Sequence, residues 1–194
     1  MKKYNFFALV GRLRWINRWS LMRNSFNENV AEHSWETSVI AHALAVIGNK
    51  CFDGDYDANK IAVSMLFHDA EESLTGDIPT PIKKLTDSIR QSHKELETHA
   101  CKILTDNLPK ALKSVYKGFI CVENCEKTRR LKKGADLISA YIKCTLEENS
   151  GNKEFSGAKK TIQKSLADLN LLEVNYFMEH FVPAYGKNLD ELIK

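Results

Sequence analysis

Apolar residues recur at spacings of three and four along most of the chain, and no stretch alternates apolar and polar residues in a sustained way. This period is typical of amphipathic helices, in which positions three and four apart share one face. Only four prolines interrupt the pattern. We therefore expect an all-α protein. The two clearest inward stripes are Val30, His33, Thr37, Ile40 and Leu44 in one helix and Leu131, Ala135, Ile138 and Ile142 in another.

Capping and stop residues divide the pattern into separate helices. The first carries apolar residues from Phe6 to Ile16 and ends before a loop of cations and aromatics over residues 17–24. With 194 residues, of which 43% are hydrophobic, the chain is long enough for one well-buried core, so we expect a single domain over residues 1–194. The further helices are expected from residue 27 or 29 to 48, from a cap at Asp57 to Gly76, from a cap at Asp87 to 106, and over 108–119, 124–148 and 153–182.

Composition and charge exclude several classes of protein. The net charge of +3 and the pI near 8.5 are only mildly basic, which argues against a dedicated nucleic-acid binder. The apolar run near the N-terminus is too short for a signal peptide, and no run is long enough to span a membrane. Five cysteines at irregular spacing favour free thiols in a reducing compartment. We expect a cytoplasmic protein that binds neither membranes nor nucleic acid.

A polar, titratable stretch lies at residues 66–81, where the pattern predicts the end of a buried helix. His68 and Asp69 are adjacent, and Glu72 follows one turn later, on the face that continues the stripe of Ile61 and Met65. Burying an imidazole and two carboxylates requires a partner, and a metal ion is the obvious one. Gly76 is expected to stop the helix, and the prolines that follow stiffen the loop after it.

Ligand-type residues also occupy two other inward stripes. Together with His68 and Asp69, His33 and Asp136 provide two imidazoles and two carboxylates, a set suited to a divalent ion such as Mn, Fe, Co, Ni or Zn. One ion would satisfy four buried polar groups that otherwise need four separate partners. Each residue also has an ordinary structural explanation. The alternatives are a hydrogen-bonded core histidine at His33, a cap or a lysine partner for Asp69 and Glu72, and an ion pair of Asp136 with Lys132 or Arg129.

The spacing of His33, His68-Asp69 and Asp136 resembles the H…HD…D signature of the HD-domain phosphohydrolases, which are metal-dependent helical enzymes. The chain is most similar to one branch, the YfbR-type 5'-deoxynucleotidases, over essentially its whole length. The resemblance implies an HD-domain, phosphodiesterase-like helical bundle. The segments that carry it are Arg18-Trp19, 21–24, 28–34, His68-Asp69-Ala70 with Glu72, 74–77, 79–81, 141–144, 176–179 and 181–183.

The resemblance implies hydrolysis of deoxyribonucleoside 5'-monophosphates to deoxyribonucleosides and phosphate, with selection against ribonucleotides. It places His33, His68, Asp69 and Asp136 around the metal ion and makes Arg18 the residue that grips the phosphate. Glu72 is the candidate acid or base, chosen over Glu71 because only Glu72 shares the face of His68 and Asp69. Asp77 would contact the sugar or protonate the departing 5'-oxygen. The sugar would be enclosed by Trp19, Asp77, Ile78, Pro79 and Thr80, and the substrate would also contact His33, Asp69 and Asp136.

The same resemblance implies one divalent transition-metal ion per subunit, such as Co²⁺ or Mn²⁺, and a homodimer. Two alternatives stay open. One is another enzyme, an HD phosphodiesterase or nucleoside triphosphohydrolase, and the other, from a different class, is a nucleotide-binding HD module without catalysis. A basic cluster at residues 127–133 falls outside the resemblance. Because no aromatic residues interleave with it, we interpret it as a solvated helix face rather than a nucleic-acid contact.

Overall fold

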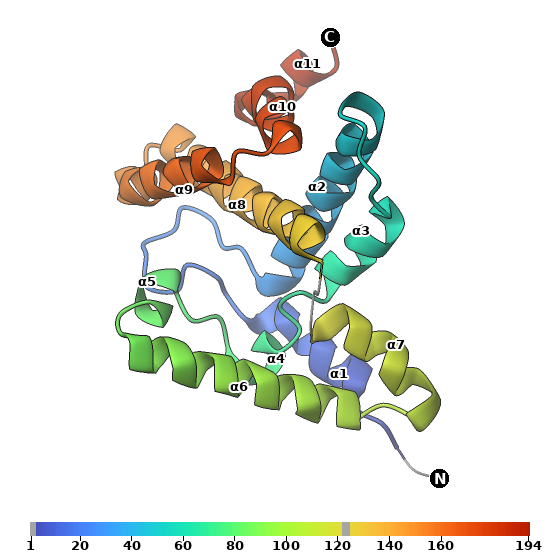
Figure 1. Cartoon of the computed structure of the whole chain (residues 1–194). Coiled ribbons are helices and arrows are strands. Elements are labelled where there is room, and N and C mark those ends of the chain that lie inside the picture. Colours follow the sequence, from blue (N-terminus) through green and yellow to red (C-terminus); the bar gives the residue numbers. More distant parts are fainter. Residues whose placement is uncertain (1–2, 122–124) are drawn as a thin grey trace. The chain divides into compact units, whose positions relative to one another are not determined.

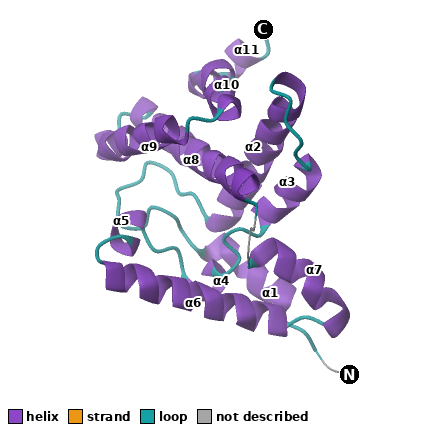
Figure 2. Ribbon diagram, viewed as in Figure 1, coloured by secondary structure: helices purple, strands orange, loops and turns teal. Residues whose placement is uncertain are grey.

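The computed structural model describes residues 3–121 and 125–194, and the regular elements in these ranges are all helical (Figures 1 and 2). The expectation of an all-α chain is therefore confirmed. One isolated antiparallel bridge joins Asn17 and Asn29. The elements are α1 (Phe6–Val10), the 3-10 helix η1 (Gly11–Trp15), α2 (Val30–Cys51), α3 (Ala58–Leu66), α4 (Glu72–Thr75), α5 (Thr80–Lys83), α6 (Asp87–Asp106), α7 (Lys110–Ile120), α8 (Glu126–Asn149), η2 (Lys153–Phe155), α9 (Ser156–Leu169), α10 (Leu172–His180), η3 (Val182–Gly186) and α11 (Leu189–Leu192).

Backbone contacts divide the chain into two compact units. The first contains residues 1–22, 27–35 and 63–124, and the second contains residues 23–26, 36–62 and 125–194. The expected single domain over residues 1–194 stays a prediction. Within the described ranges, no helix combines the length and the apolar character needed to cross a lipid bilayer.

The first unit is built around α6, which contacts α1, α4, α5 and α7. Its core contains Phe6, Leu104, Leu108 and Ile120, which are between 0% and 8% exposed. Aromatic rings extend this core, and the ring centroids of Phe6 and Tyr116 are 5.0 Å apart. The packing of α1 and α7 against α6 holds the segment around Ala70, which is itself fully buried in the same cluster.

In the second unit, α8 contacts α9, α10 and η3. The four residues of its predicted stripe, from Leu131 to Ile142, are at most 1% exposed, which confirms that stripe. A Cβ atom at Gly134 would come within 2.6 Å of Val174 Cγ2, so this glycine permits close helix packing. The predicted stripe of α2 is confirmed as well, because its five residues from Val30 to Leu44 are also at most 1% exposed.

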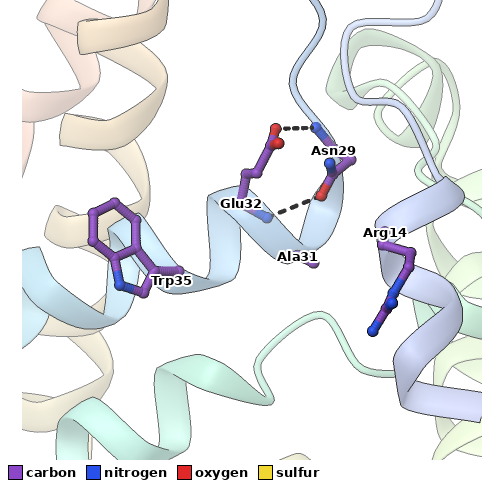
Figure 3. Close-up of a pocket in the computed structure, with 5 residues that line it drawn as sticks. All are labelled: Arg14, Asn29, Ala31, Glu32 and Trp35. Atoms are coloured by element: carbon purple, nitrogen blue, oxygen red, sulfur yellow. Dashed lines mark hydrogen bonds between the residues drawn. The ribbon is translucent and has the colours of Figure 1, made fainter. Parts of the chain in front are cut away.

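The start of α2 carries a reciprocal cap. The Asn29 backbone N–H donates to Glu32 Oε2 at 3.1 Å, and the Glu32 backbone N–H donates to Asn29 Oδ1 at 3.0 Å. Figure 3 shows both bonds beside a shallow pocket whose other lining residues are Arg14, Ala31 and Trp35. Of the two start residues that the sequence allowed, the structure therefore selects Asn29. The cap fixes the helix end one turn before His33.

The prediction of one continuous helix from Asp57 to Gly76 is wrong in its middle part. Asp57 caps it and Gly76 ends α4 with φ +73°, as predicted, but α3 stops at Leu66. Residues 67–71 form turns in which the backbone bonds run three residues back, as from the Ala70 N–H to the Phe67 carbonyl at 3.2 Å. The stripe from Ile61 to Glu72 is therefore not a continuous face of an α-helix.

Other helix boundaries also differ from those expected. The helix predicted over 153–182 breaks at Asn170, whose left-handed φ of +46° ends α9, and Leu172 beyond the break is 58% exposed. The first helix changes to 3-10 geometry at Gly11. Thr86 rather than Asp87 caps α6, through a bond from the Ile89 backbone N–H at 3.2 Å. The structure begins α8 at Glu126, and the predicted start at residue 124 lies outside the described residues.

Candidate active site

The segment from Asn17 to Asn29 forms a closed loop that presents Arg18 and Trp19. Its two ends are joined by the Asn17–Asn29 bridge and by the Arg18 backbone N–H, which donates to the Glu28 carbonyl at 2.9 Å. Trp19 has a left-handed φ of +58°, an uncommon conformation for a bulky residue. A bond from the Met22 backbone N–H to the Trp19 carbonyl at 2.9 Å closes the turn that follows.

Glu28 organises the side chains of this loop. Its Oε2 accepts from Arg18 Nη1 at 2.8 Å and from Trp19 Nε1 at 2.9 Å. The Arg18 guanidinium carbon also lies 5.8 Å from the centroid of the Trp19 ring. No local sequence pattern predicts this role of Glu28, although Glu28 lies in segment 28–34, which carries the family resemblance. It holds two of the predicted substrate residues together.

His33 lies one turn into α2 and is 1% exposed. Arg18 Nη1 is 2.7 Å from His33 Nδ1. Because a guanidinium can only donate, His33 Nδ1 accepts in this pair, and a neutral His33 then carries its proton on Nε2. Arg18 therefore provides the hydrogen-bond partner that His33 would need as an ordinary core histidine.

His68 and Asp69 lie in the turns after α3 and face His33. His68 Nδ1 is 2.7 Å from the Met65 carbonyl oxygen, so it donates there and leaves Nε2 as the basic nitrogen. His68 Nε2 is 3.1 Å from Asp69 Oδ2, and His33 Nε2 is 3.7 Å from the same oxygen. The two imidazole ring centroids are 5.3 Å apart. Two ring nitrogens thus converge on one carboxylate oxygen.

Glu72 is 6% exposed, and its carboxyl group has a strongly raised pKa. Burial raises the pKa of Glu72 to about 9, and the negative charges of Asp69 and Asp77 add to the rise. Lys83 Nζ, 3.5 Å from Glu72 Oε1, opposes it. Burial also raises the pKa of Asp77, against the lowering effect of Arg18 and Lys83. The structural alternative for Glu72, pairing with a lysine, therefore has a partner in Lys83. The acidic neighbours Asp69 and Asp77 are present as well.

Glu71 occupies different surroundings. It lines a pocket with residues of α6 and α7, among them Glu97 and Cys101, and with Cys121, which directly follows α7. Burial, followed by the charge of Asp69, raises the pKa of Glu71 to about 7. The continuous helical face on which the preference for Glu72 rested is absent, so the choice of Glu72 over Glu71 stays a prediction.

The loop after Gly76 is shorter than expected. Ile78 and Pro79 are half-buried, whereas Thr80 is exposed and already begins α5. Pro81 follows within the first turn of α5, where a missing N–H costs no helical hydrogen bond. Asp77 and Ile78 thus lie between a glycine with positive φ and a short proline-started helix.

Asp136 lies on α8 in the second unit, and its carboxylate oxygen is 2.6 Å from Lys133 Nζ. The ordinary explanation of Asp136 as an ion-pair partner therefore applies, because Lys133 pairs with it. The neighbouring basic residues also have local partners. Lys127 Nζ lies 4.3 Å from the centroid of the Tyr56 ring, and Arg130 donates to a backbone carbonyl.

Comparison with known proteins places the chain in a family. Residues 5–185 match the family described as "5'-deoxynucleotidase YfbR-like". The chain belongs to the YfbR-like family. A protein of Enterobacter sp. strain 638 named 5'-deoxynucleotidase is 44% identical over 193 residues, covering 99% of this chain and 97% of the relative. A Pasteurella multocida protein with the same designation is 42% identical and covers 99% of both chains.

Solved structures support the HD-domain fold. An HD-domain phosphohydrolase from Listeria innocua matches with a TM-score of 0.81 at 20% identity, over 93% of this chain and 88% of that one. The cyanophage S-2L HD phosphohydrolase DatZ, "bound to dA and one catalytic Zn2+ ion", matches with a TM-score of 0.64 at 15% identity, over 91% and 95%. The predictions of the YfbR-like family, the HD-domain fold and the 5'-deoxynucleotidase class are confirmed.

Proposed function

We propose that the chain hydrolyses deoxyribonucleoside 5'-monophosphates to deoxyribonucleosides and phosphate with the help of a divalent metal ion. The observation that carries this proposal is the convergence of His33 Nε2 and His68 Nε2 on one oxygen of Asp69, at 3.7 and 3.1 Å. Arg18 and Glu72 adjoin this cluster, so a phosphate-binding cation and a proton-transfer group accompany the candidate ligands. Membership of the YfbR-like family supports the same reaction.

The donor set suits a first-row transition metal. His68 Nε2 and His33 Nε2 lie 3.1 and 3.7 Å from Asp69 Oδ2, and imidazole nitrogen and carboxylate oxygen are ligand types that such an ion prefers. We propose His33, His68, Asp69 and Asp136 as the ligands of one ion per subunit, Asp136 by its place in the family motif. When bound, the ion supplies Lewis-acid polarisation of the phosphate and lowers the pKa of a water molecule. Co²⁺ and Mn²⁺ are the proposed metals, and the Zn²⁺ of DatZ belongs to that protein.

Arg18 is the proposed phosphate ligand. Its guanidinium is always charged and matches phosphate oxygens, whereas here it donates to Glu28 and His33. Ligation of a metal by His33 Nε2 requires the ring proton on Nδ1, and Nδ1 then no longer accepts from Arg18. Arg18 would then be able to turn toward the substrate phosphate, while Glu28 would keep it near Trp19.

Glu72 and Asp77 are the proposed proton-transfer groups. The raised pKa of Glu72 suits a carboxyl group that holds a proton at neutral pH until a nearby positive charge favours its release. Asp77, whose pKa is also raised, is proposed to protonate the departing 5'-oxygen or to bind the sugar. Trp19, Ile78, Pro79 and Thr80 would wall the sugar, and a close wall would exclude a 2'-hydroxyl group.

A substrate panel tests the proposal. Phosphate release would be measured from matched deoxyribo- and ribonucleoside monophosphates, with added Co²⁺ or Mn²⁺ and with a chelator. We expect metal-dependent release that favours the deoxyribonucleotides. Equal rates on both sugar series would overturn the selectivity, and a preference for triphosphates or phosphodiesters would overturn the monoesterase assignment. Nucleotide binding without release under all metals would identify a non-catalytic module.

We also propose a cytoplasmic homodimer in which residues 1–194 form one HD domain. The family match runs through both compact units, which supports a single domain. Exposed apolar residues at the ends of α10, Leu172 at 58% and Phe181 at 46%, support a subunit contact. Light scattering after size exclusion tests the dimer, and a single calorimetric unfolding transition would support one domain.

A further inference from the structure

Helix α8 carries a buried ion pair that the proposed reaction does not use. Lys143 and Glu147 are 2% and 0% exposed and are bonded to each other across one helical turn. Lys143 Nζ also lies 3.5 Å from the centroid of the Phe26 ring. Removing two charges from water costs several kcal/mol per ion, so a buried pair is weak evidence for stability alone. A role in holding the surrounding backbone in one conformation would explain why the pair is buried.

Apart from a bond from Asn152 to Glu147, the further hydrogen bonds of the pair described here go to one short segment, residues 23–26. Lys143 Nζ donates to the Phe26 carbonyl at 2.6 Å, and the Ser25 backbone N–H donates to both carboxylate oxygens of Glu147 at 2.9 and 3.1 Å. Asn152 Nδ2 bridges Glu147 Oε2 at 2.8 Å and the Arg23 carbonyl at 2.7 Å. Three backbone groups of residues 23–26 are therefore bound by three side chains more than a hundred positions later in the chain.

Residues 23–26 are the tip of the loop that carries Arg18 and Trp19. The ends of this loop are closed at Asn17 and Asn29, and the turn from Trp19 to Met22 leads directly into the tip. A loop held only at its ends retains conformational freedom between them, whereas a bound tip removes it. The left-handed backbone of Trp19 also needs surrounding constraints to persist.

We propose that Lys143, Glu147 and Asn152 are positioning residues that hold the tip at 23–26 and thereby keep Arg18 and Trp19 in place for the nucleotide. The inference rests on the proposed function, because it acts through the phosphate and sugar contacts assigned to Arg18 and Trp19. The proposal also gives a role to Lys143 in segment 141–144. That segment carries the family resemblance, but none of its residues has a part in the proposed reaction.

The test compares two neighbouring glutamates on α8. Glu147→Gln removes the charge that holds the tip. Glu148→Gln is the matched control. Glu148 is also paired to a lysine, Lys159 at 2.8 Å, and accepts from the Ser156 hydroxyl at 2.7 Å, and both of these partners lie in α9 rather than in the loop. In Glu147→Gln we expect faster hydrogen exchange in a peptide spanning 17–29 and a KM for dAMP raised about tenfold, with a smaller change in kcat. Glu148→Gln should change neither.

A double-mutant cycle separates positioning from general damage. If Glu147 acts through Arg18, Glu147→Gln should have little further effect on KM in an Arg18→Ala background. Equal fold-changes in both backgrounds, or unchanged exchange over 17–29 in Glu147→Gln, would overturn the proposal. Asn152→Ser provides a milder second variant if Glu147→Gln does not fold, because it removes the donor to Arg23 and keeps a capping oxygen for η2.

Failure of the positioning role can be distinguished from failure of the proposed hydrolysis reaction. If the parent protein releases no phosphate from dAMP, calorimetric Kd values for dAMP replace KM in the same variants and in the same cycle. Hydrogen exchange over 17–29 needs no turnover. Absence of hydrolysis in the parent thus refutes the reaction, whereas an unaffected loop and unaffected dAMP binding in Glu147→Gln refute the positioning role.

Discussion

Removing the charge of Glu147 should destabilise the protein in a pH-dependent way, because it leaves the buried Lys143 without a counter-charge. Burial pushes the pKa of Glu147 upward, but bonds from Lys143, Asn152 and Ser25 outweigh it and lower this pKa from 4.5 to about 2. A difference of about 2.5 pKa units between unfolded and folded protein corresponds to about 3 kcal/mol at neutral pH. We expect Glu147→Gln to lose about this free energy of unfolding at pH 7, because Lys143 is then buried without a counter-charge.

The sign of the pH dependence follows from the depressed pKa. A carboxyl group with a lowered folded pKa stabilises the protein above its unfolded value of 4.5, and the contribution disappears as the pH falls toward about 2. The difference in unfolding free energy between parent and Glu147→Gln should therefore be constant from pH 7 to pH 6. It should fall to about half by pH 3.

Urea unfolding of the metal-free protein, followed by far-ultraviolet circular dichroism at pH 7, 5 and 3, measures this difference. A chelator removes any stabilisation by bound metal. The control is Glu148→Gln, whose carboxylate is 29% exposed and whose ion pair with Lys159 should contribute less than about 1 kcal/mol. A loss below about 1 kcal/mol in Glu147→Gln at pH 7, or a loss that is the same at pH 7 and pH 3, would refute the reasoning.

The remaining predictions concern the candidate ligands and the packing of α8. His68→Ala should lose both bound metal and phosphate release; elemental analysis showing an unchanged metal content would remove His68 from the ligand set. Glu72→Gln should keep its metal but lose at least about a hundredfold in kcat, and loss of metal as well would make Glu72 a ligand. Gly134→Ala should lower the unfolding free energy by about 1–3 kcal/mol, because its Cβ would lie 2.6 Å from Val174 Cγ2. Gly157→Ala, in α9 with no atom within 4 Å of the new Cβ, should instead be neutral or stabilising.

Local sequence patterns determined the helical class and the buried faces. Apolar residues at spacings of three and four predicted stripes on α2 and α8 that are almost fully buried. Gly76 was predicted as a helix stop because glycine tolerates the positive φ that it adopts. The family motif also selected the candidate site residues. In the first unit, His33 and His68 lie near Asp69, Arg18 contacts His33, and the charge of Asp69 acts on Glu72, while the roles of these residues stay predictions.

Helix continuity and polar partners were decided only by the tertiary structure. Periodicity did not reveal the turns after Leu66 or the break at Asn170, because the apolar spacing continues through both. Nothing in the local pattern indicated that Glu28 would join Arg18 to Trp19, or that Glu147 would accept from Ser25, 122 positions earlier. Hydrogen bonds between distant residues depend on how the backbone brings them together, whereas helix periodicity is set by residues within a few positions of one another.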